Sequence, residues 1–403
     1  MHALAITEQG AALHAEGDTL LVRRGAALLR RVRVNEIDQV LLFGRVELSS
    51  GAVALLARRG VDVVWATQSA KFRARLATRF SKNVALRLAQ YGAVTDEQFC
   101  LRAARAIVTA KIRHQREILL RAQRRLQDER LAGVLGQLRL LCDRAPGERG
   151  LDALRGVEGQ AAALYFSQFD KLILAPGFEF NGRNRRPPRD PVNACLSFGY
   201  AVFGSIIETE ILRCGLDPFL GVFHQAAYGR ASLMLDLLEE FRPVIDGLVL
   251  RLINRRQLAA GDFDRLSGQS LEDILGDDAT PPDHPAVAPG DSATGGFFDD
   301  LAVDEPFDAP PAPPPAVEPA PVSAPGAPAH AEPPAARPEY GVFLGETGRR
   351  IFLAEFFKRM RETLFYPPRQ SSFELRDILR EQVYHFARVI DGRDPDYTPF
   401  MPS

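Results

Sequence analysis

The chain has 403 residues, enough to bury a large core. Because a single core rarely grows beyond about 250 to 300 residues, two ordered domains are expected. The formal net charge of −1 does not by itself indicate a polyanionic partner. Residues 276–338, however, hold eleven Asp/Glu and one Arg, so the rest of the chain has 49 Lys/Arg against 40 Asp/Glu, a net charge of +9. A basic body of this kind suits nucleic acid.

Cysteine usage and hydropathy exclude several other classes of protein. The four cysteines show no CxxC pair, so the spacing indicates neither a zinc knuckle nor a disulfide framework, and we expect reduced core thiols. The first residues lack the pattern of a signal peptide, and no uninterrupted apolar run reaches the roughly 18 residues that a membrane helix needs. We therefore expect a cytoplasmic protein without membrane contact.

Short alternating runs separated by turn signals fill the start of the chain and predict a β-rich domain over residues 1–80. One helix interrupts the strands. It is expected to start at Ser49 or Ser50, which can cap its N-terminus, to run to about Arg59, and to end at the stop signal Gly60. The apolar run after Gly60 then reads as another strand.

Helical spacing takes over from about Lys82, and we expect a helical domain made of residues 81–275 and 339–403. Its clearest helix is predicted over 103–131, with an apolar stripe and a basic face. That face is either an ordinary solvated surface or a surface for nucleic acid. The basic residues assigned to it are Arg102, Arg105, Lys111, Arg113 and Arg116.

Residues 276–338 contain seventeen prolines and almost no periodic apolar residues, so they cannot bury enough surface to offset their ordering entropy. We expect a disordered acidic insert within the helical domain, since helices are predicted again over 349–364 and 373–389. The expected fold class is α+β, with a small N-terminal β-rich domain followed by a larger all-α catalytic domain that the insert interrupts.

Glu158 lies in a helical stretch with Ala162 and Tyr165 on the same stripe, and Gly156 and Gly159 remove side-chain bulk beside it. Backbone or substrate could therefore approach closely. A single glutamate in a helix is more often a surface residue than a ligand. The two glycines weaken the helix, which favours a compensating role at this position.

His224 follows an apolar run and precedes a helix predicted over residues 231–242. The leucines of this helix and Phe241 would form its buried face, so that Asp236, Glu239 and Glu240 share the opposite face. Three acids beside a histidine can hold a hard divalent ion, and this donor set suits Mg²⁺ or Mn²⁺ better than zinc. A core histidine beside a solvated acidic face is the alternative.

A loop between these segments carries four arginines within seven residues, is stiffened by prolines, and leads into a helix expected to start near Pro191. Such a loop could clamp phosphates, or it could be ordinary surface charge. The arginines are Arg183, Arg185, Arg186 and Arg189.

Taken together, these segments resemble the CRISPR-associated endonuclease/integrase family, the catalytic subunit of spacer acquisition. The resemblance covers the β-rich start, the helical body to about Gln257 and the tail from Tyr340 to Phe400, and leaves the acidic insert outside the pattern. The motifs that carry it are GVEGQAAALYF at 156–166, RRPPRDPVNACLSFGY at 185–200, GLDP at 215–218, His224 and GRASLMLDLLEEFRP at 229–243.

The resemblance implies a β domain used to form a homodimer and a helical domain with a Mg²⁺ or Mn²⁺ site. The expected metal ligands and catalytic residues are Glu158, His224 and Glu239, with Asp236 as a fourth catalytic residue that either binds the metal or supports it. His224 would ligate the metal or shuttle a proton. DNA contacts are predicted for Tyr165, Arg183, Arg185, Arg186, Asn193, Arg230 and Arg242.

The family joins the 3′-hydroxyl of a captured DNA fragment to a phosphodiester at the edge of the first repeat. The implied partners are double-stranded DNA (prespacer and CRISPR repeat) and a small ferredoxin-like CRISPR-associated subunit that completes a heterohexamer. Whether an end-trimming nuclease joins them is left open. The insert is either a spacer, or it competes with DNA for the basic surface or tethers a partner.

Two other functions fit parts of the pattern. The chain could be a structure-selective nuclease that cuts branched DNA in repair, or a non-catalytic DNA-binding scaffold whose acids cap helices. A scaffold needs basic loops but no converging acids, so the set of Glu158, His224 and Glu239 favours an enzyme.

Overall fold

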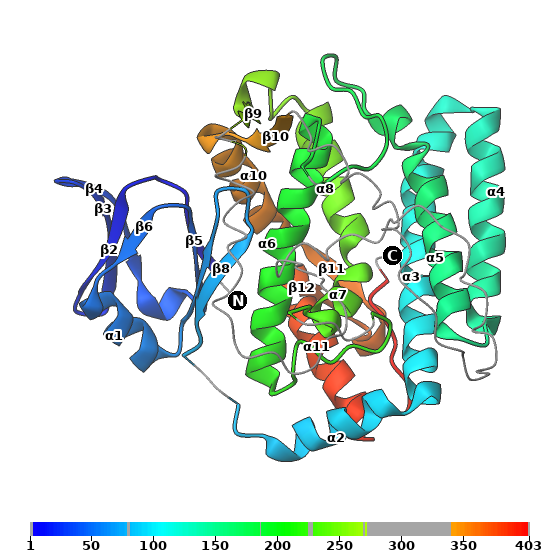
Figure 1. Ribbon diagram of the computed structural model, residues 1–403, viewed down its shortest axis with the longest axis horizontal. Helices are drawn as coiled ribbons and strands as arrows, with labels where there is room; N and C mark the ends of the chain where they lie inside the picture. Colours follow the sequence, from blue (N-terminus) through cyan, green and yellow to red (C-terminus); the bar gives the residue numbers. More distant parts are fainter. Residues whose placement is uncertain are drawn as a thin grey trace, which may run out of the picture.

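The computed structural model describes residues 3–78, 81–185, 187–224, 229–268, 271 and 340–401. Strands from the start of the chain form one side of the molecule and helices form the other (Figure 1). The predicted α+β class is therefore confirmed. The predicted insert at 276–338 lies outside the described residues.

Two four-stranded sheets make up the N-terminal part. One has the order β4-β3-β2-β6 and the other β1-β5-β7-β8, in which β5 runs parallel to both β1 and β7. The strands are β1 (Ala3–Ile6), β2 (Ala11–Glu16), β3 (Thr19–Arg24), β4 (Ala27–Arg33), β5 (Gln39–Phe43), β6 (Val46–Leu48), β7 (Asp62–Ala66) and β8 (Phe72–Leu76).

The single helix predicted among these strands is present as α1 (Ser50–Arg59). Ser49 is its N-cap, and its hydroxyl accepts a hydrogen bond from the backbone N–H of Ala52 at 3.3 Å. Gly60 ends the helix in the left-handed conformation, with φ of 66°. The capping residues therefore located this helix from the sequence alone.

The second sheet separates two hydrophobic cores. Alternate residues of β5 point to opposite faces, so that Val40 and Leu42 belong to the core shared by the two sheets and α1, whereas Leu41 and Phe43 belong to the core of the helical part. All five residues of β5 are buried, which explains the apolar run from Val40 to Phe43. The sheet thereby anchors the helical part directly.

The helical part is arranged around α6, of which 89% of the most apolar window is buried. By length and composition α6 could cross a membrane, but this burial identifies it as a core helix. The helix starts at Pro191, as expected, and Asp190 caps it. The helices are α2 (Val84–Thr95), α3 (Glu97–Leu126), α4 (Glu129–Arg144), α5 (Leu151–Phe166), α6 (Pro191–Cys214), α7 (Ser232–Glu239), α8 (Arg242–Asn254), α10 (Glu346–Met360) and α11 (Leu375–Ile390).

Two predicted helices are interrupted in the structure. The helix expected over 103–131 ends at Leu126, because Gln127 adopts a left-handed conformation and Asp128 caps α4 instead, accepting from the backbone N–H of Leu131 at 2.8 Å. The helix expected over 231–242 divides into α7 and α8. Pro243 lies in the first turn of α8, where its missing N–H does no harm.

The helical part also contains two small antiparallel sheets that were not predicted, so the prediction of an all-α domain was incomplete. One pairs β9 (Phe263–Ser267) with β10 (Tyr340–Leu344), and the other pairs β11 (Thr363–Tyr366) with β12 (Ser371–Glu374). Because Ser267 pairs with Tyr340, the chain leaves and re-enters the described structure at neighbouring points.

Candidate active site

The loop before α7 is folded around the carboxylate of Asp236. This carboxylate accepts backbone N–H groups from Val222 at 2.6 Å, Phe223 at 3.1 Å and His224 at 2.9 Å. Gly221 makes the approach possible, since a Cβ at this position would lie 2.6 Å from Asp236 Oδ2. Asp236 therefore satisfies buried backbone donors and fixes the loop that carries His224.

His224 is held in one orientation by the same carboxylate, which lies 2.6 Å from its Nδ1. A carboxylate acceptor favours the tautomer with the proton on Nδ1, so that Nε2 keeps its lone pair. Among the described residues, the buried Nε2 atom has no hydrogen-bond partner. The imidazole is thus set up to bind a cation or to accept a proton through Nε2.

Glu158 and Glu239, which are 81 positions apart in the sequence, meet at the ammonium group of Lys111. Lys111 Nζ contacts Glu158 Oε1 and lies 2.6 Å from Glu239 Oε2. Arg242 Nε lies 3.0 Å from the other oxygen of Glu239. We call Lys111, Glu158, Glu239 and Arg242 the ionic cluster; it joins α3, α5, α7 and the start of α8.

Both glutamates are 0% exposed, so the neighbouring charges decide whether each carboxylate is ionised. Burial raises the pKa of Glu158, and Lys111 only partly opposes it. Burial would also raise the pKa of Glu239, but Arg242 and Lys111 together lower it to about 2. Glu239 is the more strongly ionised acid because it faces two cations.

The predicted metal ligands can be tested for fit on these observations. Within the described ranges, no three His, Cys, Asp or Glu side chains form a ready-made cluster for a metal ion. Glu158 Oε2 and His224 Nε2 are nevertheless buried atoms that could ligate a metal ion, and neither has a hydrogen-bond partner among the residues described. Two carboxylates and one imidazole suit Mg²⁺ or Mn²⁺. The residues therefore fit a divalent cation, although a lysine now contacts both carboxylates.

Open space lies beside the helix that carries Glu158. A Cβ added to Gly156 or Gly159 would meet no described atom within 4 Å. No described backbone therefore packs against these glycines, so the space that we expected for a close neighbour is open along this stretch of α5.

Tyr165 lies in the core and not on a surface. It is 0% exposed, and its hydroxyl donates to Asp246 Oδ2 at 3.0 Å. Tyr200 donates to the other oxygen of Asp246, and the Arg242 guanidinium lies over the Tyr200 ring at 5.0 Å. In this conformation Tyr165 presents no ring face to DNA, and it links α5 to α8 beside the ionic cluster.

The arginine-rich loop is organised by Asn193, which is 0% exposed. Its side-chain oxygen accepts from Arg183 Nη1 at 2.7 Å and from the backbone N–H of Asn184 at 3.1 Å, and its amide nitrogen donates to Asp190 at 2.6 Å. Arg183 also donates to Ser197 at 3.1 Å. Asn193 and Arg183 thus hold the loop against the start of α6.

Two of the remaining predicted DNA-binding residues lie near the edges of described segments. Arg185 and Arg230 are partly exposed, Arg185 at the end of one segment and Arg230 shortly after the next gap. Arg186 lies outside the described residues. Arg242, which is 7% exposed, belongs to the ionic cluster.

The acidic face predicted for the helix after His224 is not solvated, because all eight residues of α7 are buried. Glu240 follows Glu239 but faces a separate group of neutral donors. Tyr397 donates to its Oε1 at 2.6 Å, and Gln382 at 3.0 Å and the backbone N–H of Phe400 donate to its Oε2. We call Glu240, Gln382, Tyr397 and Phe400 the tail network.

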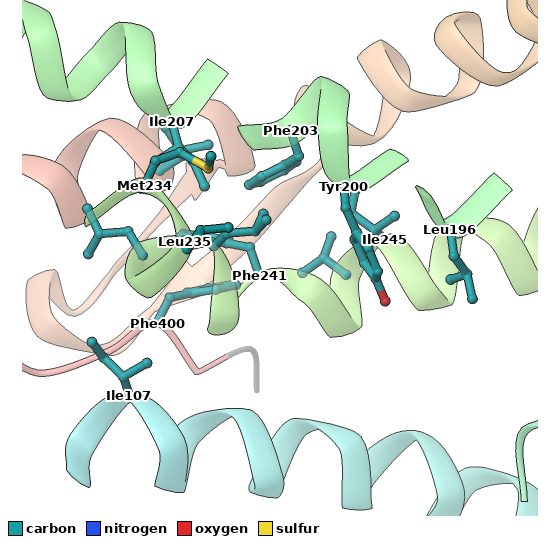
Figure 2. Packing of buried hydrophobic residues seen from close by; sticks show 14 of the residues in the cluster. Ile107, Leu196, Tyr200, Phe203, Ile207, Met234, Leu235, Phe241, Ile245 and Phe400 are labelled. Atoms are coloured by element: carbon teal, nitrogen blue, oxygen red, sulfur yellow. The ribbon is translucent and has the colours of Figure 1, made fainter. Parts of the chain in front are cut away.

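The tail network ties the end of the chain to the helix that carries the catalytic candidates. Phe400 stacks on Phe241 with ring centroids 5.3 Å apart, and Figure 2 shows this pair next to Leu235 of α7. Burial raises the pKa of Glu240 to about 8, against the hydrogen bonds from Tyr397 and Phe400. Glu240 is therefore largely protonated at neutral pH, unlike Glu239.

Lys111 is the main residue that the sequence assigned wrongly. We placed it on a basic face that was either solvated or faced nucleic acid, but it is 4% exposed and belongs to the ionic cluster. A signal for its burial existed, because Lys111 lies four positions after Ile107 and three before His114, which are both buried on the inner stripe of α3.

Comparison with known proteins places this chain in a family. The family model described as CRISPR associated protein Cas1 matches residues 4–278. A CRISPR-associated endonuclease Cas1 of Rhodospirillum rubrum is 36% identical over 296 residues, 69% of this chain and 83% of that protein. An exonuclease Cas4/endonuclease Cas1 fusion of Geobacter sulfurreducens is 37% identical over 261 residues, 63% of this chain and 47% of the fusion.

Solved structures share the fold at low sequence identity. A Cas1 protein from Thermotoga maritima has a TM-score of 0.68 at 19% identity, with 97% of each chain covered. A casposase bound to integration product has a TM-score of 0.70 at 20% identity, covering 99% of this chain and 93% of the casposase. A chain of a Cas6-RT-Cas1–Cas2 complex has a TM-score of 0.71 at 18% identity, covering 99% of this chain and 36% of that one. With the family model matching more than half of its length, this chain belongs to the CRISPR-associated Cas1 family.

Proposed function

We propose that this chain is a divalent-metal-dependent DNA endonuclease and integrase that inserts spacer DNA into a CRISPR repeat. The observation that carries the proposal is the meeting of Glu158 and Glu239 from distant helices, beside a histidine whose Nδ1 is already occupied. The R. rubrum relative is named an endonuclease, and the casposase of similar fold is bound to an integration product. Both names agree with this chemistry.

In the proposed reaction, the 3′-oxygen of the incoming DNA strand attacks a phosphodiester. A new P–O bond forms, the bond to the leaving 3′-oxygen breaks, the attacking hydroxyl loses its proton, and the leaving oxygen gains one. Glu158, Glu239 and His224 would hold Mg²⁺ or Mn²⁺. A divalent ion bound there would supply polarisation of the phosphoryl oxygen and stabilisation of the leaving oxygen.

The residues around this set have supporting roles in the proposal. Asp236 keeps His224 in the tautomer that leaves Nε2 available, so it acts as a positioning residue and not as a direct ligand. If His224 does not ligate the cation, its Nε2 is placed to accept the proton of the attacking hydroxyl. Arg242 neutralises Glu239 and keeps that carboxylate ionised.

DNA would approach over the basic surface of the helical part. A surface groove of about 440 Å³ runs between α3 and the end of the chain, and Arg102, Arg105 and Arg113 line it together with the single acid Asp396. Arg185 lies in the loop before α6 and Arg230 in the loop before α7, and both are proposed phosphate contacts. Arg183 and Asn193 hold the loop that carries Arg185. Such contacts neutralise phosphates without reading sequence.

We further propose a homodimer that uses the edge strand β4. This strand pairs only with β3 among the described strands and exposes Leu28 and Leu29, which are 42% and 40% accessible. A Cas2-type subunit as a second partner is supported by the Cas1–Cas2 complex of similar fold. An end-trimming nuclease as a further partner is supported by the relative that is fused to an exonuclease.

The decisive experiment is strand transfer of a DNA fragment with a free 3′-hydroxyl into a supercoiled plasmid that carries the repeat, with Mg²⁺ or Mn²⁺. We expect Glu158→Ala to reduce transfer by at least about a hundredfold, because it removes a proposed ligand. Glu117→Ala, which removes an exposed acid of α3, is the matched control and should retain activity. Transfer that persists in Glu158→Ala contradicts the site.

The same assay separates the alternatives. A structure-selective repair nuclease would cleave branched DNA without transferring a strand into the repeat. A non-catalytic scaffold would bind DNA and show no metal-dependent reaction in the wild-type protein or the variant.

A further inference from the structure

The Lys111 ammonium occupies the position where the proposed site would need positive charge. It contacts a carboxylate of α5 and a carboxylate of α7, and it is buried with them, since its side chain is 5% exposed and theirs are 0% exposed. Arg113, the nearest exposed arginine of α3, is two positions from Lys111 and so lies on a different face of the helix. It therefore belongs to the site and not to the basic surface.

The ionic cluster has no net charge without a metal ion. Two glutamates face one lysine and one arginine, so that the four groups sum to zero when all are ionised. Removing a partner from such a buried set leaves an uncompensated charge, which is strongly unfavourable. Adding a divalent cation while Lys111 stays in place would likewise leave two excess positive charges in a buried site.

Resting on the metal site proposed above, we propose that Lys111 is a built-in counter-cation of that site. It holds Glu158 and Glu239 together while no metal ion is bound, and it leaves the carboxylates when a divalent cation binds. The ammonium and the metal ion thus compete for the same oxygens. Lys111 thereby stabilises the metal-free protein and lowers its affinity for the cation. In this role it is a positioning residue that does not touch the reacting DNA.

The test is a titration of the full-length protein with Mn²⁺ alone, in which electron paramagnetic resonance measures the concentration of free Mn²⁺. Lys111→Met keeps most of the apolar stem and removes the charge. We expect this variant to bind Mn²⁺ about tenfold more tightly than the wild type, because the competing cation is gone. Its thermal midpoint without metal should fall, and its rise on adding Mn²⁺ should exceed that of the wild type.

Two further variants show whether charge at this position is the cause. Lys171→Met removes another lysine that is paired with an acid. Its Nζ lies 2.9 Å from Asp128, it is not a member of the ionic cluster, and its loss should leave Mn²⁺ affinity unchanged. Lys111→Arg keeps the positive charge and should bind Mn²⁺ within about threefold of the wild type. A tenfold gain in Lys111→Arg would overturn the proposal, since the charge would then not be responsible.

The remaining outcomes are equally decisive. Mn²⁺ affinity that is unchanged or weaker in Lys111→Met overturns the role of Lys111 but leaves the metal site intact. If neither the wild type nor this variant binds Mn²⁺, the proposed metal site itself is wrong. A Lys111→Met protein that is unfolded without metal and refolds in Mn²⁺ supports the proposal. One that stays unfolded in Mn²⁺ overturns it.

Discussion

Glu239 and Glu240 are neighbours in the chain and are both 0% exposed, yet they lie in two chemically different regions. Glu239 belongs to the ionic cluster, where Arg242 and Lys111 keep its pKa at about 2. Glu240 belongs to the tail network, where burial raises its pKa to about 8 and its partners are uncharged. A single step along the chain at the end of α7 therefore separates an ionised acid from a protonated one.

The difference teaches how one helix can serve chemistry and architecture together. A cluster held by an ammonium and a guanidinium charge can exchange one cation for another, whereas a neutral hydrogen-bonded acid has nothing to exchange. The ionic cluster is therefore suited to a reaction that moves charge. The tail network holds the frame, because it joins α7 to α11 and to the last residues of the chain.

The largest expected effect comes from the matched pair Glu239→Gln and Glu240→Gln. Glu239→Gln leaves two buried cations against one acid, so we expect strand transfer to fall by at least about a hundredfold and stability by about 3 to 5 kcal/mol. In Glu240→Gln the amide oxygen can accept from Gln382 and Phe400 while the amide nitrogen donates to Tyr397. Its activity should stay within about threefold of the wild type.

Strand-transfer activity and thermal melting, measured for both variants in parallel, test this prediction. Equal losses in the two variants would show that the two regions do not differ in function, and the comparison would have to be abandoned.

A second prediction concerns the packing of the tail network. Phe400→Ala removes a ring that is 0% exposed and stacks on Phe241, so we expect it to lower the free energy of unfolding by about 3 to 5 kcal/mol. Mn²⁺ affinity should stay close to that of the wild type, because no group of the ionic cluster is altered. Urea denaturation and Mn²⁺ titration measure the two quantities.

Phe365→Ala is the control for this substitution, since Phe365 is 41% exposed and its loss should cost much less stability. A large change in Mn²⁺ affinity in Phe400→Ala would mean that the tail network sets the geometry of the ionic cluster.

The smallest expected effect is a pH dependence at Asp246, a third buried acid that lies among tyrosines. Burial raises its pKa to about 6, although Tyr200 and Tyr165 donate to it. The folded protein therefore favours the protonated acid. This contribution to stability is fully present below the unfolded pKa near 3.8 and is lost as the pH rises through about 6.

Asp246→Asn keeps a neutral acceptor and donor at the same place and cannot ionise. We expect its stability relative to the wild type to increase between pH 4.5 and pH 7.5 by on the order of 2 kcal/mol. Urea denaturation of both proteins at the two pH values measures the difference. A relative stability that does not change with pH, or that falls, would show that Asp246 is ionised throughout, like Glu239.

Local signals were sufficient for much of the fold. Ser49 and Gly60 located α1, and Pro191 located the start of α6, because capping and proline geometry depend on a few adjacent residues. The two small sheets around β9 and β11 were not predicted. Their strands are four or five residues long. Their stability comes from pairing between strands that are separated by a turn or by the residues between Ser267 and Tyr340, not from a periodic pattern.

The sequence by itself determined the family motifs, the separation of acidic insert from basic body, and the residues Glu158, His224 and Glu239 as candidates. Only the tertiary structure decided which charges balance them. Lys111 and Arg242 reach Glu239 from other helices, Asp236 turns its carboxylate to the His224 loop, and Glu240 faces the end of the chain. Pairing of buried charges depends on distances between elements that are remote in sequence, and no local pattern encodes those distances.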